Sequence, residues 1–230
     1  MKTIFGLICC VVISNVSAQF FVQKLDQTQI LNPEQFYIIN NEGDTIRGKL
    51  GGVTFTDSLI TSVVVKNGDS KTKYRISDIE KLAVIPGDQA DYDEMALNKI
   101  IKNLDNDEFI KVLPEGGWVF YERIRLPGKR ERYELAQLLN PGFDSEIKVY
   151  AHPDATDSGS TSINGLTVGG LNDNQHYVTL REGQAFVMNN FNYRKKANER
   201  LYNNCEALSS QKLKWKDFAT HVFTYDQDCN

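Results

Sequence analysis

Three pairs of short, β-prone segments, each joined by turn-forming residues, constrain the fold of this chain more than any other feature. In the first pair, an aromatic and β-branched run leads through Asn40–Asp44 into a segment that alternates apolar and polar residues. Asn, Gly and Asp favour the tight turns of hairpins, and alternation is typical of a half-buried strand. The pairs are 36–39 with 45–50, 62–66 with 72–76, and 177–180 with 185–188.

Further segments extend this antiparallel β-body. Short strands are predicted at 79–85, 109–113, 118–126, 132–138 and 147–150, with Pro and Gly turns between several of them. This spacing favours a sandwich, roll or barrel over parallel βαβ units. Gly51 and Gly52 predict a bulge or a second turn.

Two segments of the β-body differ from the strands around them. Residues 91–104 predict a short helix, because they carry a broad apolar stripe with acids crowded at its start. Residues 153–174 are rich in Gly, Ser, Thr, Asn and Asp and predict a long mobile loop.

The last forty residues change to a helical period. Tyr193, Ala197, Leu201 and Cys205 recur every four residues, so they predict one apolar stripe of a helix. A second stripe is formed by Phe218, Val222 and Tyr225. The expected architecture is therefore α+β: a β-rich body over 19–188, then a helical hairpin over 189–230 packed on the same domain.

The first eighteen residues have the pattern of a cleavable signal peptide. Lys2 precedes the apolar run Ile4–Ile13, and Val16–Ala18 supplies the compact residues of a cleavage site. Ten apolar residues are too few to span a bilayer, and no later segment predicts a transmembrane helix. We therefore expect an exported protein that is periplasmic, outer-membrane-associated or extracellular.

Charge and cysteine content limit the function classes. Removing residues 1–18 takes away one lysine and no acid, so the formal net charge changes from −4 to −5. That mild acidity argues against a non-specific nucleic-acid binder. Cys9 and Cys10 leave with the signal, and Cys205 and Cys229 remain. In an exported chain this pair predicts a disulfide that closes a loop of about 25 residues and stabilises the fold by roughly 3 kcal/mol.

Three local patterns together resemble a family of exported proteins of Bacteroidetes-type Gram-negative bacteria. The patterns are GDTIRGKL at 43–50, FIKVLPEG at 109–116 followed by Phe120 and Tyr121, and a C-terminal set at 193–196, 204–208 and 225–229. Asn204 and Glu206 depart from the Asp and Pro that the family usually has there. The resemblance implies an envelope location and a β-rich body with C-terminal helices, and it carries over no catalytic residue.

Histidines and carboxylates at the two ends of the predicted loop are the candidate metal ligands. His152 and Asp154 stand at its entrance, with Asp157 close behind, and Asp173 and His176 stand at its exit. Imidazole and carboxylate bind zinc, copper or iron. Polar loops also collect such residues because they are solvated, and no HxH or HExxH spacing occurs. No cofactor is predicted.

Two other clusters have both a structural and a functional interpretation. Arg194, Lys195, Lys196 and Arg200 would meet anionic lipid or form a solvated helix face. His221 lies beside an apolar stripe, where a histidine is usually packed rather than catalytic.

No catalytic motif is recognised, and two function classes remain. We expect a non-enzymatic binding or structural module of the envelope whose partner is a protein or a glycan. The alternative is an envelope-polymer hydrolase or metal-binding protein that uses the loop with His152 and His176, or a pair of carboxylates across a cleft.

Overall fold

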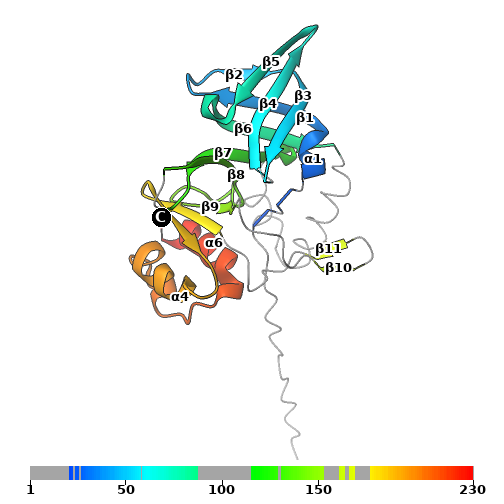
Figure 1. Ribbon diagram of the computed structural model, residues 1–230. Coiled ribbons are helices and arrows are strands. Elements are labelled where there is room, and N and C mark those ends of the chain that lie inside the picture. The colour runs from blue at the N-terminus through cyan, green and yellow to red at the C-terminus, as the bar shows by residue number, and fades with distance from the viewer. Residues whose placement is uncertain are drawn as a thin grey trace, which may run out of the picture.

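The computed structural model describes residues 21–22, 24–25, 27–57, 59–87, 115–128, 131–152, 161–163, 166–168 and 177–229 (Figure 1). The predicted signal peptide, the helix at 91–104 and the strand at 109–113 lie outside these residues. Antiparallel β-sheets followed by C-terminal helices form an α+β fold, as the sequence predicts.

The largest sheet is antiparallel and has five strands in the order β2-β1-β6-β7-β8. Its first hairpin turns at Asn40, whose side-chain Oδ1 accepts hydrogen bonds from the backbone N–H groups of Glu42 and Asp44. The strands are β1 (Pro33–Asn40), β2 (Thr45–Arg47), β6 (Ile79–Pro86), β7 (Val119–Arg125) and β8 (Tyr133–Gln137). Short 3-10 turns precede β6 and β7: η1 (Ile76–Asp78) and η2 (Glu115–Gly117).

A second sheet of three strands contains β3 (Lys49–Thr56), β4 (Leu59–Asn67) and β5 (Ser70–Arg75). The sequence predicts one strand over 45–50, and this is wrong: β2 pairs with β1, whereas β3 pairs with β4. Gly48 is the point of transfer, because a Cβ there would lie 2.7 Å from the carbonyl oxygen of Lys66. The pairing of β3 with β4 shifts register between Leu50 and Gly52, which confirms the predicted bulge.

A third sheet joins the first through a short bridge. Its strands are β9 (Ile147–Ala151), β12 (Tyr177–Arg181) and β13 (Gln184–Met188), in the order β13-β12-β9. Leu138, directly after β8, bridges to Tyr150 of β9, and the Leu139 N–H donates to the Val149 carbonyl. The predicted loop at 153–174 is not without strands, since β10 (Thr161–Ile163) pairs with β11 (Leu166–Val168).

The three-stranded sheet β3-β4-β5 packs on one face of the five-stranded sheet, and their apolar side chains form the core of the body (Figure 1). Val63 and Val65 of β4 are buried against Ile38 of β1 and Leu82 and Val84 of β6 in the same cluster. Along β4, Val63 and Val65 alternate with the less buried Val64 and Lys66, so the core face of β4 determines which of its residues face away from the core.

The C-terminal helices cover the third sheet and enclose a second core rich in aromatic rings (Figure 1). Phe218 lies within 5.5 Å of the ring centroids of Tyr193, Trp215 and Phe21. The elements are α4 (Tyr193–Lys196), the π-helix η3 (Ala197–Leu201), α5 (Glu206–Ser209), the 3-10 turn η4 (Trp215–Asp217) and α6 (Phe218–Asp228).

The predicted stripe from Tyr193 to Cys205 is buried, but it does not lie on one helix. The first helical run ends at Leu201, and a turn separates it from Cys205, which precedes α5. The side chain of Arg181 explains why the helical run ends at Leu201. Its guanidinium donates to the carbonyls of Arg200 and Leu201 and so replaces further helical hydrogen bonds there. The second stripe lies on α6 as predicted, with all three residues buried.

The N-terminal segment of the described chain connects both cores. Phe21 and Val22 are buried in the helical core, whereas Leu25 and Ile30 belong to the core of the body. The Val22 N–H donates to the Leu139 carbonyl. The following helix, α1 (Gln27–Leu31), places Ile30 against the body.

Gly48 provides a test of this topology. Replacing it with Ala would place a Cβ 2.5 Å from Asn67 Oδ1 and 2.7 Å from the Lys66 carbonyl oxygen, which backbone pairing holds in place. We expect Gly48→Ala to lower the free energy of unfolding by about 1–3 kcal/mol, measured by chemical denaturation. An unchanged denaturation midpoint would contradict the transfer of the chain between sheets at this residue.

Candidate functional site

Four lysines gather on the outer face of the sheet β3-β4-β5. Cross-strand pairing sets Lys49 of β3 directly opposite Lys66 of β4, and Lys66 directly opposite Lys71 of β5. Lys73 lies two residues along β5 from Lys71 and therefore on the same face, opposite Val64. We call these four residues the lysine face.

The backbone of β3 makes room for the central lysine. A Cβ on Gly51 would lie 3.0 Å from Cγ and 3.1 Å from Cε of Lys66, so the Lys66 stem lies over this glycine. Lys66 is half-buried as a result, while Lys49, Lys71 and Lys73 are exposed. Lysine commonly packs its aliphatic stem on a surface while its ammonium group stays in water.

The lysine face concentrates positive charge whose ammonium groups make no ion pair with a described acid. Within the described part of the chain, no ion pair or hydrogen bond engages the ammonium groups of Lys49, Lys66, Lys71 or Lys73. Like charges directly opposite each other on neighbouring strands are destabilising. Three lysines in one row, in a chain with net negative charge, thus lower stability and attract anions.

Arg75 marks the border of the lysine face. It lies on the same side of β5, opposite Ser62, but Asp78 is close to it. The Arg75 backbone N–H donates to Asp78 Oδ2 at 3.0 Å, and this bond, with a second one from Ser77, lowers the pKa of the Asp78 carboxyl. The acid partly balances Arg75, so the face is defined by its lysines.

A second polar cluster surrounds Glu122 on β7 and links the first sheet to the third. Glu122 Oε1 pairs with Lys81 at 3.0 Å, and its Oε2 pairs with Lys148 at 2.9 Å and accepts the Tyr150 hydroxyl at 2.6 Å. Burial favours the neutral acid, but the bonds from Tyr150 and Lys148 outweigh it and lower the pKa of Glu122. Burial raises the pKa of the adjacent Asp144. Both oxygens of Glu122 are engaged, so this cluster holds strands together.

The candidate metal ligands are not assembled in the described structure. His152 follows β9 and is half-buried, whereas Asp154, Asp157, Asp173 and His176 lie outside the described residues. Among the described residues, no group of three His, Cys, Asp or Glu side chains is placed to hold a metal ion. The metal hypothesis stays a prediction.

His221 is a packed residue of the helical core. It is 5% exposed, and its Nδ1 shares a hydrogen bond of 2.5 Å with the Tyr193 hydroxyl. Its ring stacks on that of Tyr193, with 6.0 Å between centroids. Burial lowers the pKa of His221, because the charged imidazolium loses its solvation, so the neutral ring is the form that the fold favours.

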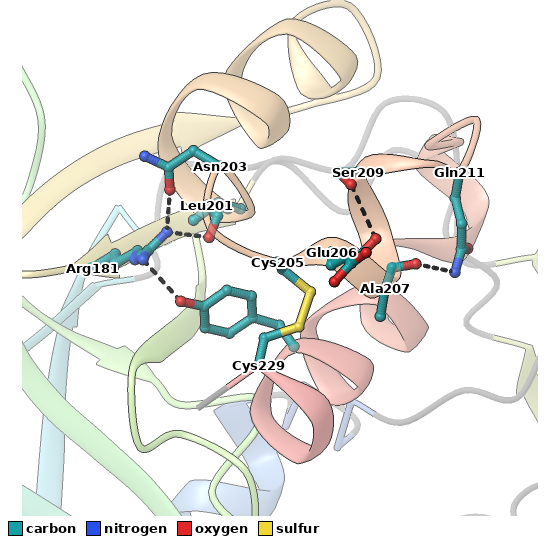
Figure 2. Close-up of a disulfide and its surroundings, with 10 residues drawn as sticks. Arg181, Leu201, Asn203, Cys205, Glu206, Ala207, Ser209, Gln211 and Cys229 are labelled. Carbon is teal, nitrogen blue, oxygen red and sulfur yellow. Dashed lines mark hydrogen bonds between the residues drawn. A yellow bond between two sulfur atoms is a disulfide. The ribbon is translucent and has the colours of Figure 1, made fainter.

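The disulfide and a buried arginine hold the C-terminal end on the third sheet (Figure 2). Cys205 and Cys229 are bonded, with 5.3 Å between their Cα atoms, as the sequence predicts. Arg181, at the end of β12, donates to the Leu201 carbonyl, to Asn203 Oδ1 and, at 2.8 Å, to the Tyr225 hydroxyl. Figure 2 shows the arginine pointing into this ring of acceptors beside the disulfide. A disulfide indicates an oxidising compartment.

The basic cluster of the first C-terminal helix is not a set of four free charges. Lys196 donates to the Val187 carbonyl at 2.8 Å, and the Arg200 guanidinium lies over the Phe186 ring, 5.4 Å from its centroid. Arg194 and Lys195 are exposed. This divides the cluster between internal contacts and solvent.

One aromatic side chain of the same region is exposed. Phe191 is 91% exposed in the turn between β13 and α4. Reciprocal bonds fix that turn, since the Asn189 N–H donates to Asn192 Oδ1 and the Asn192 N–H donates to Asn189 Oδ1. Single exposed apolar residues are common on protein surfaces.

Sequence reasoning missed the lysine face. The alternation of Lys73 and Arg75 on the predicted strand 72–76 already places two cations on one side, whereas Lys71 lies just before that predicted strand. Adding Lys49 and Lys66 requires the register of β3, β4 and β5, which depends on a bulge and on the division of the predicted strand at Gly48.

Comparison of the chain with protein-family models, with curated proteins and with solved structures gave no match. The resemblance to exported proteins of Gram-negative bacteria stays a prediction. Of the helices that the structure describes, none has both the length and the apolar composition needed to cross a bilayer.

The disulfide should contribute to stability through its loop. Cys205 and Cys229 are separated by 24 positions, so Cys205→Ala/Cys229→Ala should lower the free energy of unfolding by about 2–4 kcal/mol. Chemical denaturation with and without reductant measures this. Reductant should lower the denaturation midpoint of the parent protein and leave that of the double variant unchanged. A parent midpoint that is insensitive to full reduction would rule out the stabilising role.

The buried histidine predicts a pH dependence of stability. The unfolded chain has a histidine pKa of about 6.5, and burial lowers the folded value. The stabilisation is therefore complete above about pH 6.5 and is lost as the pH falls towards the folded pKa. We expect the Tm of the parent to fall more steeply than that of His221→Asn between about pH 7 and pH 5, by thermal unfolding. Parallel curves of Tm against pH for the two proteins would refute the role of His221 in this pH dependence.

Proposed function

We propose that this chain is a non-enzymatic, exported binding module of the cell envelope that presents its lysine face to an acidic partner, a protein or a glycan. The observation that carries the proposal is the row Lys49, Lys66 and Lys71, which makes no ion pair within the described residues. Export is supported by the predicted signal peptide and by the disulfide between Cys205 and Cys229.

Repulsion between the opposed lysines distinguishes a binding surface from an ordinary solvated surface. A sheet face that serves only solubility gains from mixed charges, because opposite charges across strands stabilise and like charges destabilise. Departures from local rules of stability are expected at functional sites. The lysine row breaks the rule against opposed like charges on three neighbouring strands. Elsewhere in the sheets, Lys81 and Lys148 are paired with Glu122.

Removing the central charge tests whether the row lowers stability. Lys66→Met keeps the stem over Gly51 and removes two directly opposed pairs, those with Lys49 and with Lys71. We expect the variant to gain about 1 kcal/mol, which raises the Tm by about 2–4 °C for a chain of this size. Thermal unfolding at low ionic strength measures this.

The matched control is Lys216→Met, which changes an exposed lysine of η4 among the C-terminal helices. It should stay within about 0.5 kcal/mol of the parent. The gain of Lys66→Met should also shrink at 1 M salt, because screening weakens repulsion between exposed charges. A Lys66→Met variant no more stable than the parent would remove the argument for a functional face.

A further inference from the structure

We propose that the ligand of the lysine face is an acidic polysaccharide, a linear glycan that carries carboxylates or sulfates along its length and lies across strands β3, β4 and β5. This inference rests on the proposed function and specifies the partner. It follows from the arrangement of the cations and from the side chains that the face lacks.

The cations form a row across three strands with one further lysine beside it. Neighbouring strands of a sheet lie about 4.8 Å apart, and residues i and i+2 lie about 6.8 Å apart along a strand. Lys49, Lys66 and Lys71 therefore form one row across the sheet, and Lys73 extends it along β5. An extended polymer with a regularly repeated negative charge can follow such a row, and each flexible lysine can follow an anion to its place.

The composition of the face disfavours a protein partner. The cores of protein interfaces are enriched in aromatic residues and Arg and depleted in Lys. Here all four cations that define the face are lysines, and the aromatic Tyr74 of β5 packs towards the body core. Lysine is a compact point charge that does not require one fixed anion geometry, which suits a polymer of many similar groups.

The same composition disfavours a membrane or a nucleic acid. Proteins that lie on a bilayer insert large apolar side chains, whereas the apolar residue among the lysines is the half-buried Val64. Single-stranded nucleic acids are bound by exposed aromatic rings that stack on bases. Electrostatic attraction is therefore the main interaction that the lysine face offers, and a flexible acidic glycan can bind through it.

The experiment uses the full mature chain and three probes at low ionic strength. Polygalacturonate is the acidic glycan, a DNA duplex is a second polyanion, and phosphatidylglycerol vesicles are an anionic membrane; neutral dextran is the blank. The test variant is Lys66→Met/Lys71→Gln/Lys73→Gln. The matched control is Lys212→Gln/Lys214→Gln/Lys216→Gln, which removes the same charge from exposed lysines near α5 and η4.

We expect the parent to bind polygalacturonate more tightly than DNA or vesicles. The test variant should lose about tenfold in affinity for polygalacturonate, while the control variant should lose less than about threefold. Isothermal titration calorimetry gives the affinities, and thermal unfolding confirms that each variant is folded. Binding should weaken as salt is added, because the contacts are solvated ion pairs.

Other outcomes separate the failure of this inference from the failure of the proposed function. The test variant could lose affinity for DNA or vesicles while polygalacturonate binds weakly, or binds the test and control variants equally. The lysine face would then be a binding surface, but its assignment to a glycan would be wrong. If the test and control variants behave alike with every probe, both the face and the glycan assignment are refuted.

Discussion

Burial of Val63 and Val65 against the five-stranded sheet determines how the rest of the sheet β3-β4-β5 is presented. Side chains alternate along a strand, so burying these two valines forces Val64 and Lys66 outward. Because β3 and β5 pair with β4, residues directly opposite each other share a face, so Lys49 and Lys71 face outward with Lys66. A slip of one residue would bury the lysines, and the hydrophobic core excludes it.

The two cores of the molecule are connected through several independent contacts. The N-terminal segment contributes Phe21 to the helical core and Leu25 to the body core. Glu122 binds Lys148 and Tyr150 of the third sheet and Lys81 of the first. At the far end, the disulfide holds the last helix to Cys205, beside the hydrogen bonds of Arg181. None of these described contacts involves Lys49, Lys66, Lys71 or Lys73.

Much of the fold could be predicted because its signals are local. Turn residues between alternating segments located the hairpins β1–β2, β4–β5 and β12–β13, and the four-residue period located the buried stripes of the C-terminal helices. The division at Gly48 could not be predicted, because it depends on the carbonyl of Lys66, a residue distant in sequence. The end of the helix at Leu201 depends on Arg181 in the same way. The lysine face combines three strands, and the Glu122 cluster combines β6, β7 and β9, so pairing must be known before either can be recognised.

We propose that the four lysines of the sheet β3-β4-β5 contact the ligand. Lysine-specific chemical labelling of the full mature chain, with and without polygalacturonate and analysed by mass spectrometry, tests it residue by residue. We expect reduced labelling of Lys49, Lys66, Lys71 and Lys73 and unchanged labelling of Lys212 and Lys216. Protection spread evenly over all exposed lysines, or confined to those near α4 and η4, would contradict it.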